Sequence, residues 1–235
     1  MNAQPQPSPL IPNELDLLES LVPLAQARIL EAGCGAARLA RELLQRHPGA
    51  ELTGIEVDDR QHAKNLADPA PRLTFLRAGA QQVPFPDASF DGALMLKSLH
   101  HVPRPLMAQA LGELARVVRP GGWLYVSEPV YAGDFNEVIR IFNDEREVRA
   151  AAQQAVDAAA AAGPWRQVEE RRFVAPGKFR DFAEFQQRIV NSTFADHRLD
   201  EATLARVRAA FEPHVGPDGA NFTVPVHVRL LRRAG

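Results

Sequence analysis

Short apolar runs alternate with amphipathic segments through the first half of the chain. Strands are expected at residues 28–31, 51–57, 73–77, 90–96 and 123–128. The run at 90–96, FDGALML, is nearly all apolar, which is typical of a strand that is covered on both faces. Between the strands, hydrophobic residues recur at helical spacing, for example Leu39, Leu43 and Leu44. This alternation predicts a parallel sheet with helices on both faces.

The second half of the chain has a different pattern. Helices are expected at residues 134–162, 178–191 and 200–212, and strands at 167–175 and 221–232. Pro225 lies within the last strand and favours a place near the sheet edge, because proline cannot donate to a strand ladder. At the other end of the chain, the first twelve residues contain four prolines and predict a flexible tail over 1–12.

Composition and charge narrow the class of protein. Of the 235 residues, 46% are hydrophobic and 24% are charged, the balance of a globular chain with a sizeable core. The net charge of −2 gives no sign of a general nucleic-acid binder. No apolar run approaches the roughly 20 residues of a membrane span, and no signal peptide is expected. A single cysteine, Cys34, excludes an internal disulfide, which fits a cytoplasmic location.

The glycine-rich stretch RILEAGCGAARLA, residues 28–40, follows a strand and opens a helix. At such a turn, backbone N–H groups and the helix dipole can hold a ligand that the glycines allow to approach closely. A dinucleotide site needs a third glycine for close helix packing, and Arg38 stands at that position. Glu31, two residues before Gly33, would repel a pyrophosphate but attract a cationic ligand. The residues therefore favour a cationic ligand over a dinucleotide.

Four stretches together resemble the class I S-adenosylmethionine-dependent methyltransferases, in particular the small-molecule type like methyltransferase domain 11. They are EAGCGAA (31–37), TGIEVDD (53–59), QQVPFPDASFDGALMLKSLHHV (81–102) and ELARVVRPGGWLYVSEP (113–129). The first is similar to the family motif [D/E]-x-G-x-G-x-G, with Ala37 in place of the last glycine. The resemblance covers residues 27–129 and hardly touches the rest of the chain.

This resemblance implies an α/β fold with a Rossmann-like, doubly wound sheet of seven mainly parallel strands. The last strand would be antiparallel, and a helical insertion would separate strands five and six. The expected organisation is the tail, 1–12, followed by a single methyltransferase domain, 13–235. Residues 130–166 would form the insertion and act as a lid over the active-site mouth.

The resemblance also implies S-adenosyl-L-methionine as the cofactor, with Glu56 binding the ribose hydroxyls. The residues expected at the cofactor are Glu31, Gly33, Cys34, Gly35, Glu56, Val57, Gly79, Ala80, Gln81 and Lys97. In many relatives an aspartate at the place of Gly79 accepts a hydrogen bond from the adenine amino group. Here the Ala80 N–H and the Gln81 side chain remain to contact adenine. Loss of the aspartate is expected to weaken binding roughly tenfold or more, which need not abolish it.

His100 and His101 follow the fourth strand, at the rim where open α/β sheets bind ligands. Either histidine could act as a general base near neutral pH, and a structural role in the turn is an equal alternative. As neighbours in a turn they are expected to point in different directions, so that at most one faces the pocket. Tyr131, Phe135 and Asn136 are expected to line the acceptor pocket. No metal site is expected, because the other histidines lack ligand spacing.

The expected function is methyl transfer to oxygen, nitrogen or carbon of a small-molecule acceptor. The chain lacks the N-P-P-Y signature of many nucleic-acid and protein-glutamine N-methyltransferases, so neither nucleic acid nor a membrane is expected as a partner. Three alternatives stay open: a non-catalytic binder of the cofactor or a metabolite, another transfer from the sulfonium cofactor, and a nucleotide-dependent oxidoreductase. The oligomeric state is open too, with a homodimer as one option.

Overall fold

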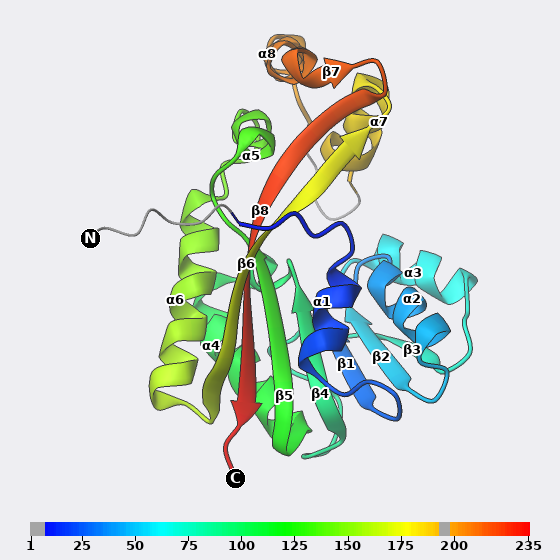
Figure 1. Cartoon of the computed structure of the whole chain (residues 1–235), viewed down its shortest axis with the longest axis vertical. Helices are drawn as coiled ribbons and strands as arrows, with labels where there is room; N and C mark the ends of the chain where they lie inside the picture. The colour runs from blue at the N-terminus through cyan, green and yellow to red at the C-terminus, as the bar shows by residue number, and fades with distance from the viewer. Residues whose placement is uncertain (1–7, 193–197) are drawn as a thin grey trace. The chain divides into compact units, whose positions relative to one another are not determined.

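A computed structural model describes residues 8–192 and 198–235 and contains one mixed sheet with helices packed on it (Figure 1). The strands are β1 (Arg28–Ala32), β2 (Glu51–Glu56), β3 (Leu73–Arg77), β4 (Phe90–Leu96), β5 (Val118–Pro129), β6 (Trp165–Phe179), β7 (Val215–Gly216) and β8 (Gly219–Arg233). The helices of four or more residues are α1 (Glu14–Leu21), α2 (Arg38–Arg46), α3 (Asp59–Ala67), α4 (Met107–Val117), α5 (Asp134–Ile139), α6 (Arg146–Ala162), α7 (Phe182–Phe185), the π-helical turn Gln186–Val190 and α8 (Glu201–Phe211).

The strand order is β3-β2-β1-β4-β5-β8-β6, and the short β7 pairs with β8. Strands β1 to β5 are parallel to one another, whereas β8, next to β5, runs in the opposite direction (Figure 1). The chain turns back after β3 to place β4 on the other side of β1, which makes a topological switch point between the carboxyl ends of β1 and β4. The expected doubly wound fold with an antiparallel last strand is confirmed.

The chain divides into two compact units, each described by itself. The first, which we call the sheet unit, consists of Leu15–Glu128, Arg146–Glu170 and Val228–Gly235. The second, the aromatic unit, consists of the described residues of Met1–Glu14, together with Pro129–Glu145 and Arg171–His227.

Strand residues that point to one face of the sheet unit pack against α4 and α6. Leu30 of β1, Met95 of β4 and Val126 of β5 belong to this buried cluster, together with Leu114 of α4 and Val156 of α6. The alternation of β-strand side chains explains why every second strand residue joins it. This packing fixes the positions of the strands, and the candidate site lies at their carboxyl ends.

The aromatic unit is built around six phenylalanines. They are Phe135, Phe179, Phe182, Phe185, Phe211 and Phe222. Their ring centroids lie 5–6.5 Å apart, for example 5.1 Å between Phe185 and Phe211, mostly in edge-on or tilted pairs that aromatic quadrupoles favour. Within this unit, Asp134 at the start of α5 binds the first half of β8, because its Oδ1 accepts hydrogen bonds from the N–H and the hydroxyl of Thr223.

Two expected helices differ from the structure. The helix expected at 134–162 is interrupted between α5 and α6, where Asn143 bonds Glu145 locally, as turn-forming residues do. The helix expected at 178–191 starts late, because β6 stays extended as far as Phe179. Asp181 then caps α7 by accepting a hydrogen bond from the Glu184 N–H.

The prediction that Pro225 lies near the sheet edge is confirmed, because its strand, β8, is the last but one in the strand order. Strand β8 lies between β5 and β6. Pro225 is tolerated there because β5 ends at Pro129, and just beyond that end the Pro225 carbonyl accepts a hydrogen bond from the Val130 N–H. A donor at position 225 is therefore not needed to continue the ladder with β5.

The tail expected at residues 1–12 lies partly outside the described residues. Within the described part, Leu10 forms a parallel bridge with Val174 of β6, and the Ile11 N–H donates to the Val174 carbonyl at 2.9 Å. No helix among residues 8–192 and 198–235 combines the length and the apolar character that crossing a bilayer requires.

Candidate cofactor and catalytic site

The glycine loop after β1 is held against two neighbouring strands. The N–H groups of Gly33 and Cys34 both donate to the carbonyl of Ile55 on β2, at 2.9 and 3.1 Å. Gly33 has a φ of +72°, and a Cβ built there would lie 2.7 Å from the Cβ of Ser98. Ser98 in turn donates a hydrogen bond to the Ala32 carbonyl at 2.7 Å. Glycine is required at position 33 both by the backbone and by the space.

Gly35 differs from Gly33 in what surrounds it. Its φ is +49°, but a Cβ added there would meet nothing within 4 Å. The open space lies beside the Gly35 N–H, which donates to Oε2 of Glu56 at 2.8 Å. A left-handed glycine next to open space is what a backbone needs to approach a ligand closely.

Glu56, at the end of β2, is anchored by three backbone donors. Its Oε1 accepts from the N–H groups of Val57 and Asp58 at 2.8 and 2.9 Å, and its Oε2 accepts from Gly35. A carboxylate has about four acceptor positions, so Oε2 can still accept a ligand hydroxyl. The side chain is fixed in place and remains able to bind a diol.

The loop lies in a negative field. Glu31 and Glu56 are both buried at the ends of adjacent strands. Burial, followed by the charges of Glu31 and Glu56, raises the pKa of the Cys34 thiol well above its usual range. The thiol therefore stays protonated and is no nucleophile. The same field favours a cationic ligand over a pyrophosphate, which weighs against the dinucleotide alternative.

Asn65 on α3 also positions the loop, and sequence reasoning did not select it. Its side chain is buried and donates from Nδ2 to the Gly35 carbonyl at 2.7 Å. Gln61, one turn earlier, donates to Oδ1 of Asn65 at 2.8 Å. The only signal in the sequence is a pair of amides spaced four residues apart, which is too common to identify such a role.

The residues expected at the adenine lie at the same edge, after β3. The Ala78 N–H donates to the Glu56 carbonyl at 3.2 Å, which ties this segment to the acid expected at the ribose. Ala80 is buried and Gln81 half-buried, whereas 63% of Val57 is exposed. Arg116 of α4 donates to the carbonyls of Val83 and Phe85 and so fixes the following loop.

Lys97 occupies a strained position at the end of β4. Its φ is +56°, a left-handed conformation that is uncommon for residues other than glycine. The Lys97 N–H donates to the Ser127 carbonyl of β5 at 2.6 Å. Backbone strain of this kind clusters at ligand sites, and the position fits the expected site at the switch point.

His100 forms a buried pair with Glu128, the last acid of β5. The His100 Nδ1 atom lies 2.5 Å from Oε2 of Glu128, and the Leu99 N–H donates to Oε1 of the same carboxylate at 2.9 Å. With Glu128 ionised, Nδ1 carries the proton and Nε2 becomes the free acceptor of a neutral imidazole. Nε2 of His100 has no hydrogen-bond partner within residues 8–192 and 198–235. Sequence reasoning placed Glu128 beside the rim but did not pair it with His100.

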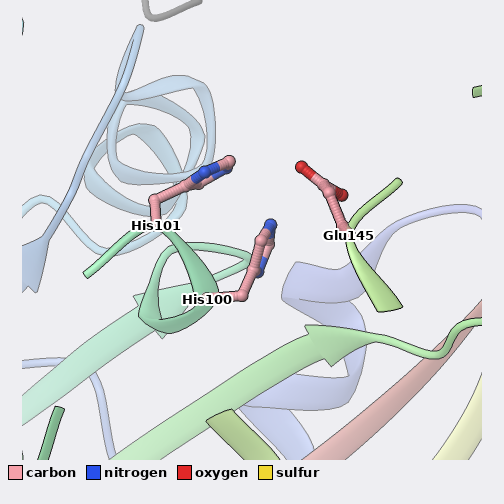
Figure 2. Close-up of side chains that lie close together, drawn as sticks. All are labelled: His100, His101 and Glu145. Atoms are coloured by element: carbon pink, nitrogen blue, oxygen red, sulfur yellow. The ribbon is translucent and has the colours of Figure 1, made fainter. Parts of the chain in front are cut away.

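The prediction that His100 and His101 point in different directions is wrong. Their ring centroids lie 4.1 Å apart, and Figure 2 shows both side chains projecting from one short turn toward the same side. The three-residue 3₁₀ turn Leu99–His101, tighter than an α-helical turn, brings them together. His100 is buried and is held by the Glu128 carboxylate, whereas His101 is exposed. Glu145, also drawn in Figure 2, belongs to the aromatic unit.

The three residues expected at the acceptor lie in the aromatic unit. Phe135 stacks on Phe179 with ring centroids 5.8 Å apart, and Asn136 is buried. Tyr131 is half-buried. Phe135 thus supports the aromatic core, and a role of these three residues at the acceptor stays a prediction.

Comparison with known proteins finds sequence similarity over part of the chain. Residues 30–126 match a family model described as a methyltransferase domain. A stretch of 119 residues is 35% identical to 27-O-demethylrifamycin SV methyltransferase of Amycolatopsis mediterranei and covers 48% of this chain and 43% of that protein. A stretch of 124 residues is 34% identical to the ubiquinone biosynthesis O-methyltransferase of Paracidovorax citrulli and covers 49% of each. The match thus spans less than half the length of these relatives.

Solved structures extend the likeness to nearly the whole chain at the level of the fold. A structure described as an S-adenosylmethionine-dependent methyltransferase from Methanosarcina mazei superimposes with a TM-score of 0.57 at 15% identity, covering 93% of this chain and 97% of that one. A [4+2]-cyclase gives a TM-score of 0.60 at 19% identity, covering 94% and 79%. The resemblance to the class I S-adenosylmethionine-dependent methyltransferases is confirmed: residues 30–126 match the methyltransferase domain model, and the chain shares the fold of the solved structures.

Proposed function

We propose that this protein transfers the methyl group of S-adenosyl-L-methionine to a small-molecule acceptor. The observation that carries the proposal is the pair of buried carboxylates, Glu31 and Glu56, around the glycine loop. They suit a ligand with a cationic group and a vicinal diol. When bound, this cofactor supplies an electrophilic methyl group on a sulfonium, so that the chain has mainly to position the reactants and exclude water.

Each part of the cofactor has a candidate partner. Glu56 would accept hydrogen bonds from the ribose hydroxyls, and Glu31 would favour the cationic methionine end. The backbone of Gly33, Cys34 and Gly35 allows close approach between them. Val57, Gly79, Ala80 and Gln81 would surround the adenine, and Lys97 would lie near the methionine end or the acceptor.

His100 would act as the general base for an acceptor that must lose a proton. Glu128 holds the imidazole with its proton on Nδ1, which leaves Nε2 to take a proton from a phenol, alcohol or amine. Both relatives described above are methyltransferases, and one is named an O-methyltransferase, which favours an oxygen acceptor. A carboxylic acid acceptor would need no base. His101 is the weaker candidate, because it is exposed, whereas His100 is buried against Glu128.

A second candidate is a protein of the same fold that binds the cofactor or a metabolite without methylating. Two observations favour it: Gly79 lacks the acceptor that many relatives have, and the same fold occurs in a [4+2]-cyclase. A fold does not fix a reaction, because function resides in the site that the fold carries.

Turnover separates the two candidates. The purified protein is incubated with S-adenosylmethionine and a panel of phenols, aliphatic alcohols, amines and carboxylic acids, and formation of S-adenosylhomocysteine is measured. Methyl transfer to at least one class, lost in Glu56→Ala, is expected. Tight cofactor binding with no acceptor-dependent turnover across the panel would favour the non-methylating candidate.

A further inference from the structure

In the segment after β3, the side chain of Gln81 occupies the space beside Gly79. A Cβ built on Gly79 would lie 2.5 Å from Oε1 and 2.6 Å from Nε2 of Gln81. The φ of Gly79 is not in the left-handed region, so the backbone itself does not demand glycine there. The carboxamide of Gln81 is folded back over residue 79 and fills the place where a larger side chain would begin.

The backbone around Gln81 is held by hydrogen bonds, whereas its carboxamide makes none within the described residues. Gln109 of α4 donates to the Gln81 carbonyl at 2.9 Å, and the Gln82 N–H donates to the Gly79 carbonyl at 3.1 Å. These contacts fix the turn that carries the side chain. In the part of the chain that the structure describes, neither Oε1 nor Nε2 of Gln81 has a hydrogen-bond partner, and the residue is half-buried.

Two neighbours complete the surroundings of this amide. The Ala80 N–H makes no hydrogen bond within residues 8–192 and 198–235, although Ala80 is buried. Val57, next to the ribose acid Glu56, exposes 63% of an apolar side chain. An exposed apolar side chain suits the flat face of a base. An N–H donor followed by an amide acceptor suits the edge of adenine, where N1 accepts and the 6-amino group donates.

We propose that Gln81, folded over Gly79, is the residue that recognises the 6-amino group of the adenine, in place of an acid at position 79. Oε1 of the carboxamide accepts from the amino group, and the Ala80 N–H donates to N1. The inference rests on the proposed function, because it concerns the base of the same cofactor. It explains why glycine stands at 79: an acid there would compete with the amide for one space.

A double-mutant cycle between side chain and ligand tests this assignment. S-adenosylhomocysteine and its analogue that lacks the 6-amino group are titrated calorimetrically into wild type, Gln81→Leu and Gln82→Leu. Leucine is similar in size but cannot accept a hydrogen bond, and Gln82 is an exposed neighbour that serves as the control. A neutral hydrogen bond corresponds to about threefold to tenfold in affinity.

Gln81→Leu is expected to lower the affinity for S-adenosylhomocysteine by about threefold to tenfold and to leave the affinity for the analogue unchanged. Gln82→Leu should change neither affinity. Adding Gly79→Asp to Gln81→Leu is expected to restore the preference for the amino compound, because an acid then fits the vacated space. Equal losses for both ligands in Gln81→Leu, or no loss for either, would overturn the assignment while leaving the proposed function intact. Wild type that binds neither ligand would overturn both.

Discussion

Nδ1 of His100 lies 2.5 Å from Oε2 of Glu128, and both side chains are buried at the carboxyl ends of adjacent parallel strands. The two residues are 28 positions apart in sequence, and the pairing of β4 with β5 brings them together. A buried carboxylate that accepts a hydrogen bond from Nδ1–H keeps the proton on that nitrogen and leaves the opposite ring nitrogen as a base, an arrangement that recurs in enzymes with histidine bases. This relationship gives the site a proton acceptor that needs no other residue.

Replacing Glu128 by glutamine tests the positioning of His100. The amide can still accept from the Leu99 N–H, but it no longer stabilises a charged imidazole. We expect kcat with a hydroxyl acceptor to fall roughly tenfold to a hundredfold, with KM for the acceptor changed little. His100→Gln should lower kcat at least as much, and steady-state kinetics on both variants measures the effect. An unchanged kcat in Glu128→Gln, with a native melting temperature, would remove the pair from the mechanism.

Replacing Glu56 by alanine is expected to weaken S-adenosylhomocysteine binding at least tenfold. The physical reason is that the ribose diol loses a charged acceptor, and such hydrogen bonds contribute about 1.5–3 kcal/mol. Asp59→Ala is the matched control, because it removes the same charge from an exposed position three residues away. Since Glu56 also holds three backbone N–H groups, circular dichroism must first show that the variant is folded. Equal affinity for wild type and Glu56→Ala would remove the ribose assignment.

The strain and crowding at Gly33 predict a loss of stability in Gly33→Ala. Its φ of +72° and the 2.7 Å approach to Ser98 act together, so the free energy of unfolding should fall by about 1–3 kcal/mol. Gly112→Ala provides the opposite control, because that glycine lies exposed inside α4 with nothing within 4 Å of an added Cβ. It should raise the free energy of unfolding by about 0.5–1 kcal/mol. Urea denaturation measures both changes. A decrease in the free energy of unfolding of less than about 0.5 kcal/mol in Gly33→Ala would contradict the loop geometry.

Acid should weaken the loop between β3 and β4 through Glu113. The Arg116 guanidinium, together with the Val83 N–H, lowers the pKa of the Glu113 carboxyl below its ordinary value. A lowered folded pKa contributes stability that is fully present above the unfolded pKa and is lost as the pH falls through the folded pKa. Glu113→Gln should therefore cost about 1 kcal/mol at pH 7 and progressively less below about pH 4. A cost that stays constant from pH 7 to pH 3 would show that the charge plays no part.

Much of the sheet unit follows from local sequence, and the reason is physical. Apolar runs such as 90–96 fit only a strand covered on both faces, and the glycine loop with Glu31 at its start marks the edge where ligands bind. The first and last residues of β3 and β4 are the ones that the sequence predicts. By contrast, the sequence does not reveal that α2 begins only at Arg38, because Ala37 adopts a left-handed conformation.

Contacts between distant residues could not be predicted. The pairing of His100 with Glu128, the hydrogen bond from Asn65 to Gly35 and the folding of Gln81 over Gly79 all depend on tertiary geometry. Only the last lies within a short stretch of chain, and there the sequence suggested that Gln81 could contact adenine but not where its amide lies. The break between α5 and α6 was missed because the alanine-rich sequence of α6, which follows it, has high helix propensity.

The most direct test of the account is isothermal titration of the purified full chain with S-adenosylhomocysteine. We predict saturable binding with a dissociation constant in the micromolar range. The affinity should fall at least tenfold in Glu56→Ala and stay unchanged in Asp59→Ala. No detectable heat or thermal stabilisation at millimolar ligand, with the protein folded, would contradict the assignment of Glu31, Glu56 and the glycine loop to this cofactor.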